Sequence, residues 1–173
     1  RTRAYLHAMI SDDLLPAYAV VLAGNRNSPT IRVPYFDNTT PSLELIRRMD
    51  IPHLVLDTDD VNSSDVINAL QVRPESVFVY SGPGGAILRK EILSTGKRFM
   101  HVHSGLLPRF RGSTTVYYSL LVQGKCGASA FFLDREIDTG PIIATQVYPA
   151  PADRTAIDHG YDPYIRSDLL MRV

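Results

Sequence analysis

The chain has 173 residues, of which 45% are hydrophobic and 21% charged, and its 18 basic and 18 acidic side chains give a formal net charge of zero. These values are typical of one ordinary globular domain rather than a disordered chain. No apolar run approaches the ~20 residues that span a membrane, so no membrane partner is expected. The absence of a basic excess argues against nucleic acid as a partner.

The only cysteine, Cys126, excludes an intrachain disulfide and favours a reducing compartment. The N-terminus does not have the layout of a signal peptide. Together these features predict a cytoplasmic protein.

Apolar runs and turn residues alternate along the chain as in a layered α/β domain. We predict helices over residues 1–15, 42–49, 62–72, 114–123 and 161–172, and strands over residues 18–23, 52–56, 76–80, 98–103, 128–133 and 142–148. Residues 25–41 contain three prolines and are predicted to form a long loop. The alternation indicates one α/β domain over residues 1–173, with a mostly parallel central sheet and helices on both faces. Because such a domain normally opens with a strand, we expect its first strand to be missing.

Two histidines mark the end of the predicted strand over residues 98–103. His101 and His103 are two residues apart, so their side chains lie on the same face of the strand. A lone buried histidine is usually structural. A pair on one face, directly before a loop rich in glycine and proline, favours a functional site, because α/β folds keep their chemistry at strand ends.

Asp138 lies in the sequence Ile-Asp-Thr-Gly-Pro between the last two predicted strands. Taken alone, it is interpreted as a turn residue that accepts hydrogen bonds from its own backbone. Beside an imidazole it would instead support a general base or a stabilised cation. Arg109 and Arg111, in the loop after the histidines, are either solvated or able to bind a phosphate or a carboxylate.

The glycine-rich turn Tyr80–Gly85 follows a predicted strand but has the spacing of neither a dinucleotide fingerprint nor a P-loop. It is interpreted as a structural turn, or as an exposed backbone edge that recognises a flat heteroaromatic ring.

Two motifs together resemble a known family. They are His101-Val-His103-Ser-Gly-Leu-Leu-Pro-Arg-Phe-Arg-Gly112 and Asp138-Thr-Gly-Pro141. They are similar to the Asn-x-His…Leu-Leu-Pro-x-x-Arg-Gly and Asp-x-Gly-Pro signatures of the formyltetrahydrofolate-dependent formyltransferases, most closely over residues 76–147. The resemblance implies a Rossmann-like formyltransferase fold. It also implies an enzyme that transfers a formyl group from N10-formyltetrahydrofolate to a primary amine.

Carried onto this sequence, the resemblance makes His103 the proton carrier and stabiliser of the oxyanion, and Asp138 its orienting carboxylate. His101 joins the catalytic residues, although it stands where the family has an asparagine that donates to the oxyanion. Ser104 stands where proline is usual. The segments that match the folate-lining parts of the family contain Tyr80, Gly82, Gly85, Ile87, Leu88, Leu133, Ile137 and Thr139. No metal is implied.

The expected acceptor is a small amine, such as an amino sugar on a nucleotide carrier. We expect no room in this chain for the additional C-terminal domain of methionyl-tRNA formyltransferase, and the chain lacks a basic excess; both features argue against tRNA as the acceptor. The sequence leaves open whether the protein forms a homodimer. Two alternatives remain at this point. His101, His103 and Asp138 could ligate a metal in a hydrolase, or the loss of the asparagine could leave a folate-binding homologue that transfers no formyl group.

Overall fold

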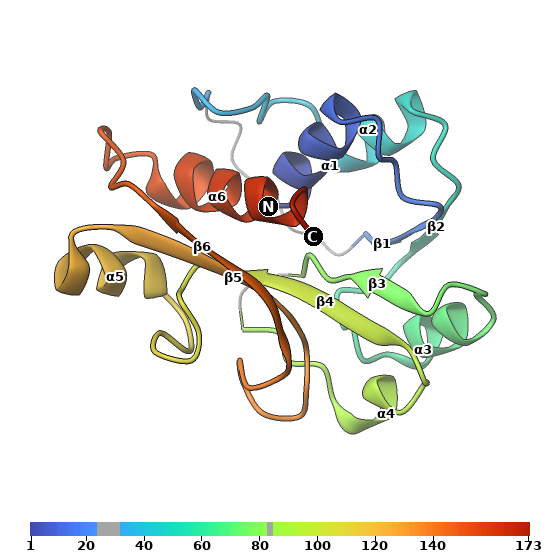
Figure 1. Cartoon of the computed structure of the whole chain (residues 1–173). Helices are drawn as coiled ribbons and strands as arrows, with labels where there is room; N and C mark the ends of the chain where they lie inside the picture. Colours follow the sequence, from blue (N-terminus) through green and yellow to red (C-terminus); the bar gives the residue numbers. More distant parts are fainter. Residues whose placement is uncertain (24–31, 83–84) are drawn as a thin grey trace.

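The computed structural model describes residues 1–23, 32–82 and 85–173. Its elements in chain order are α1 (Thr2–Ser11), β1 (Ala19–Leu22), α2 (Ser42–Arg48), β2 (His53–Leu56), α3 (Ser64–Gln71), β3 (Val77–Val79), α4 (Lys90–Leu93), β4 (Arg98–His103), α5 (Thr115–Gln123), β5 (Cys126–Phe132), β6 (Ile142–Tyr148), the π-helical turn η1 (Ile157–Tyr161) and α6 (Asp162–Leu170) (Figure 1). Every predicted helix and strand has its counterpart. The predicted loop over residues 25–41 is described from residue 32 onward, where it has neither helix nor strand before α2, and its first part lies outside the described residues.

The described strands form two sheets, β1–β2 and β3–β4–β5–β6. The β1–β2 and β3–β4 ladders are parallel, whereas β4–β5 and β5–β6 are antiparallel. The α/β fold class is therefore confirmed, but the sheet is less parallel than the sequence predicts. The short loop over residues 133–141 explains part of this difference, since a parallel connection between β5 and β6 would need a crossover of a dozen residues or more.

Helices cover both faces of the strands, as predicted. Val20 and Leu22 of β1 pack against a buried cluster that α3, α4 and Phe99 of β4 build. Ala19 and Val21, which alternate with them, pack against a second cluster contributed by α1 and α2. This alternation follows from the two-residue period of a strand. In Figure 1, α1, α2 and α6 lie on one side of the strands and α3 and α4 on the other.

The largest buried cluster joins α1, α5 and α6 to strands β4–β6, with Val102 of β4 and Ile165 of α6 fully buried in it. Two apolar patterns in the sequence predict more burial than the structure shows. Leu121 has helical spacing with Val116, Tyr117 and Leu120, which predicts one apolar side for α5, but it is 82% exposed. The apolar run over residues 76–80 predicts a buried strand, but β3 lies at the edge of its sheet and leaves Val77 and Val79 at 45% and 37% exposure.

Among the described residues, no helix combines the length and apolarity needed to cross a bilayer.

Candidate active site

The carboxyl end of β4 presents His103 to the loop that follows. The side chain is only 4% exposed, and its Nε2 lies 2.8 Å from the carbonyl oxygen of Phe110. A carbonyl can only accept a hydrogen bond, so Nε2 carries the ring proton of neutral His103 and Nδ1 carries the lone pair. Gly105 leaves the room for this bond, since a β-carbon there would lie 2.7 Å from Nε2 and 2.8 Å from the Phe110 oxygen.

The structure places Asp138 beside His103, with 3.6 Å between its Oδ2 and the histidine Nδ1. The same oxygen accepts a hydrogen bond of 2.8 Å from the backbone N–H of Gly112, which ties the β5–β6 loop to the loop after β4. Asp138 has a positive φ of 55°, a conformation that aspartate tolerates better than most residues. Gly140 is required nearby because a β-carbon would lie 1.8 Å from the carbonyl oxygen of Phe132.

Burial and the Asp138 carboxylate act in opposite directions on the His103 imidazole. Burial lowers the pKa of His103 below its ordinary value, while the carboxylate opposes this shift. The neutral ring therefore holds a lone pair on Nδ1 that faces a negative charge. Once Nδ1 takes up a proton, the resulting cation lies next to Asp138 and is stabilised by it. This arrangement is that of a general base with a partner for its protonated form.

His101 lies on the same face of β4, between the rings of Tyr80 and Phe131, each with its centroid 5.9 Å away. Its Nδ1 is 3.0 Å from the carbonyl oxygen of Tyr80, at the end of the adjacent strand. Burial, followed by the positive charge of Arg166, lowers the pKa of His101 to about 4. The imidazole is therefore neutral near pH 7.

A buried ion pair supports the other face of this strand. Arg166 of α6 donates to Asp162 Oδ2 over 2.9 Å, to the Val102 carbonyl over 2.6 Å and to Ser104 Oγ over 2.7 Å. Burial tends to raise the pKa of Asp162, but the Arg166 guanidinium holds it below the ordinary value. Arg166 thus contacts the residues on both sides of His103, the backbone of Val102 and the side chain of Ser104. The pair is not among the predicted site residues, although the i, i+4 spacing of the two charges on a predicted helix is a signal of it in the sequence.

The two predicted folate-lining segments meet in the structure. Tyr80 and Leu133 pack against one buried cluster, to which Leu88 belongs. Gly82 lies directly against the Tyr80 ring. Residues 83–84 of the predicted glycine-rich turn lie outside the described residues.

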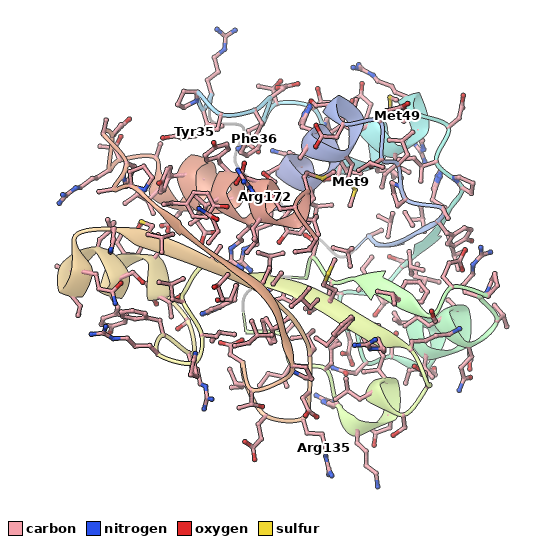
Figure 2. The ribbon with its side chains drawn as sticks, viewed as in Figure 1. Met9, Tyr35, Phe36, Met49, Arg135 and Arg172 are labelled. Atoms are coloured by element: carbon pink, nitrogen blue, oxygen red, sulfur yellow. The ribbon has the colours of Figure 1, made fainter. Side chains whose placement is uncertain are left out.

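The other residues of these segments lie nearer the surface. Gly85 and Ile87 are exposed, the latter by 51%. Ile137 is 57% exposed, and the Thr139 hydroxyl donates to the Glu136 carbonyl over 3.1 Å. Figure 2 shows Arg135 of the same β5–β6 loop pointing away from the body of the molecule. That these segments line a folate site stays a prediction.

The metal-hydrolase alternative is not favoured. Within the part of the chain that the structure describes, no three His, Cys, Asp or Glu side chains are grouped closely enough to hold a metal ion. In addition, the backbone occupies one ring nitrogen of each histidine, Nδ1 of His101 and Nε2 of His103.

A surface hollow of about 510 Å³ is lined by residues 32–39, and the predicted site residues lie outside that lining. Tyr35 and Phe36 of this segment are labelled above α6 in Figure 2, where Tyr35 stacks on Tyr164 with 4.9 Å between ring centroids.

The chain is similar to methionyl-tRNA formyltransferases over part of its length. A methionyl-tRNA formyltransferase from Clavibacter michiganensis subsp. michiganensis is 41% identical over 43% of this chain and 25% of its own length. One from Clavibacter sepedonicus is 32% identical over 63% of this chain and 35% of its own length. The chain thus spans about a quarter to a third of these two relatives.

The fold is shared with a phosphoribosylglycinamide formyltransferase from Bacillus halodurans. The two align over 98% of this chain and 89% of that protein, with a TM-score of 0.62 and 19% sequence identity. The family model for formyl transferase matches residues 31–159, well over half of the sequence and the whole stretch that carries His101, His103 and Asp138. The chain belongs to the formyl transferase family.

Proposed function

We propose that this protein transfers a formyl group from N10-formyltetrahydrofolate to the primary amine of an acceptor. The observation that carries the proposal is the pairing of His103 with Asp138, which offers a lone pair at Nδ1 beside a carboxylate. Membership of the family supports the choice of formyl donor. The meeting of the two predicted folate-lining segments on one buried cluster also fits a flat ligand at this edge.

His103 is the proton carrier of the proposed reaction. As the amine nitrogen bonds to the formyl carbon, Nδ1 of His103 takes a proton from that nitrogen. The Asp138 carboxylate stabilises the resulting imidazolium. The imidazolium then stabilises the negative oxygen of the tetrahedral intermediate. When the bond between the formyl carbon and N10 breaks, the proton passes from His103 to N10, which leaves a formamide, tetrahydrofolate and a neutral histidine.

The acceptor that we propose is a small amine with an anionic group, such as an amino sugar nucleotide. Arg109 and Arg111 are exposed on the loop that also supplies the Phe110 carbonyl, where they could bind a phosphate. The net charge of zero does not favour a large polyanion. A second candidate acceptor is aminoacyl-tRNA, because the relatives described above are methionyl-tRNA formyltransferases.

Mass spectrometry of the formylated product tests the function directly. The protein is incubated with N10-formyltetrahydrofolate and, in separate reactions, an amino sugar nucleotide, glycinamide ribonucleotide or methionyl-tRNA. We expect formylation of the amino sugar nucleotide. Formylation of methionyl-tRNA alone would replace our choice of acceptor. Binding of the formyl donor in a calorimeter without transfer to any amine would instead indicate a folate-binding homologue that has lost the activity.

The substitution His103→Ala tests the proposed role of the histidine. We expect kcat to fall by about 10²–10⁴-fold, the usual contribution of a general acid–base residue. His159→Ala, which changes an exposed histidine of the turn η1, is the matched control. Unchanged turnover in the His103 variant would contradict the mechanism.

A further inference from the structure

The family's asparagine position is occupied here by His101, and the structure determines which hydrogen bonds that side chain can make. Its Nδ1 lies 3.0 Å from the Tyr80 carbonyl oxygen. Because a carbonyl oxygen cannot donate, Nδ1 must carry the hydrogen. A neutral imidazole has only one N–H, so Nε2 of His101 carries a lone pair and can only accept.

Among the described residues, none donates a hydrogen bond to Nε2, the acceptor atom of His101. Within the described residues, the hydrogen bond to Tyr80 is the only one that the His101 side chain makes. Among residues 1–23, 32–82 and 85–173, the fully buried side-chain atoms without a partner are Tyr5 Oη, His7 Nε2 and Ser119 Oγ. Nε2 of His101 is not one of them, so it is not sealed in the core. This nitrogen is therefore accessible from the face of β4 that also carries His103.

We infer that Nε2 of His101 accepts a hydrogen bond from the attacking amine, and so has the opposite polarity to the amide donor of the family's asparagine. This inference rests on the proposed function. Among the reacting atoms, the formyl oxygen and N10 of the donor carry no hydrogen, and only the amine has N–H groups. The amine is therefore the reacting group that can pair with an imidazole lone pair.

The two histidines then have separate roles toward the nitrogen of the attacking amine. His101 holds an N–H of the amine and so directs the nitrogen lone pair toward the formyl carbon. His103, with Asp138 at 3.6 Å, takes the proton as the new bond forms. A lowered pKa of about 4 suits the first role, because His101 stays neutral and does not retain the proton.

Nitrogen NMR of the ligand-free protein labelled with ¹⁵N-histidine tests the tautomer without any assay of activity. At pH 7 we expect His101 to have a protonated Nδ1 and an unprotonated Nε2. The spectrum of His101→Asn assigns the signal. His53 is an internal reference, because its Nδ1 lies 2.8 Å from the Ile51 carbonyl and must carry the hydrogen in the same way. A proton on Nε2 of His101 would overturn the inference.

Steady-state kinetics of His101→Asn tests whether the amine is the hydrogen-bond partner of His101 Nε2. The asparagine restores the family's residue but places no acceptor at the Nε2 position. We expect kcat/KM for the amine to fall by about 10–100-fold, as for a lost hydrogen bond in a partly desolvated site, and KM for N10-formyltetrahydrofolate to stay within about twofold. His53→Asn is the control and should change neither parameter.

The outcomes separate this inference from the proposed function. Wild-type protein that formylates no amine would defeat the proposed function, and the NMR measurement would still decide the polarity of His101. Active wild-type protein with an equally active or faster His101→Asn variant would overturn the inference alone. So would a variant that raises only the KM of the formyl donor.

Discussion

The two histidines of β4 differ in the ring nitrogen that the backbone occupies. The Tyr80 carbonyl binds Nδ1 of His101, whereas the Phe110 carbonyl binds Nε2 of His103. Each neutral ring therefore offers a different nitrogen as an acceptor. The working atoms of the site follow from these two hydrogen bonds, which no feature of the local sequence indicates.

Asp138→Asn should lower kcat by at least about 10²-fold, because the amide can still accept from the Gly112 N–H but cannot stabilise protonated His103. The KM for the amine should change little, since Asp138 is not proposed to bind it. Steady-state kinetics with the acceptor found above provides the measurement. Asp134→Asn, an exposed position in the same loop, is the control. A kcat equal to that of the control would argue against the pairing.

The His101 imidazole makes folding stability depend on pH. Its pKa falls from about 6.5 in an unfolded chain to about 4 in the folded protein, through burial and the charges of Arg166 and Arg1. Between these values the unfolded chain binds more protons, so stability is complete above about pH 6.5 and is lost as the pH falls toward 4. His103, whose pKa is also lowered, adds to the loss.

Urea unfolding at pH 7 and pH 4.5 measures this effect. Over that interval the free energy of unfolding of His101→Asn should fall by about 2 kcal/mol less than that of the wild type. An equal fall in both proteins would mean that His101 already titrates near its ordinary pKa when folded.

At the scale of elements, α6 holds β4, the strand that carries His101 and His103, in place. Arg166 binds the Val102 carbonyl and the Ser104 hydroxyl, which flank His103. Ser104 stands where the family usually has proline, and its hydroxyl gives the arginine a partner that proline could not offer. The loop after β4 is also tied to β5, because Ser129 Oγ accepts from the Leu107 N–H over 2.9 Å and donates to the Gly105 carbonyl over 2.7 Å.

Arg166→Met should lower the free energy of unfolding by about 3–5 kcal/mol, because it leaves the buried Asp162 carboxylate without its main partner. Arg172→Met is a matched control on the C-terminal side of the same helix. Arg172 pairs with Asp168 at the same i, i+4 spacing but is 57% exposed, and Figure 2 shows it near the end of α6. Its loss should lower the free energy of unfolding far less, because water screens an exposed ion pair. Equal destabilisation in chemical denaturation would contradict a special role for the buried pair.

At the scale of the whole molecule, the cluster that joins α1, α5 and α6 to β4–β6 carries the packing beneath the site. Ile165 of α6 is fully buried in it, whereas Leu121 of α5 projects outward. Two aliphatic side chains that look alike in the sequence therefore differ in the apolar surface they bury on folding.

Ile165→Ala should lower the free energy of unfolding by about 2–5 kcal/mol, as expected for a cavity in a close-packed core. Leu121→Ala should change it by no more than about 0.5 kcal/mol. Thermal and urea unfolding of the two variants provides the comparison. A large loss from Leu121→Ala would mean that α5 packs against something beyond the surface described here.

The sequence by itself determined the α/β class and the positions of the described strands and of every described α-helix except α4, and its motifs singled out His103 and Asp138. Local signals carry this information: apolar runs of strand length, turn residues between them, and a cap such as Ser63, whose side chain accepts from Val66 N–H at the start of α3. The two motifs were readable for the same reason, since each lies within a few consecutive residues.

Only the tertiary structure decided how these parts meet. The antiparallel pairing of β5, the exposure of Leu121 and the burial of Arg166 depend on neighbours far away in the sequence. Which nitrogen of His101 and His103 is free also depends on carbonyl groups of other segments, Tyr80 and Phe110. Local propensity carries no information about such contacts, because they exist only after the chain has closed its long loops.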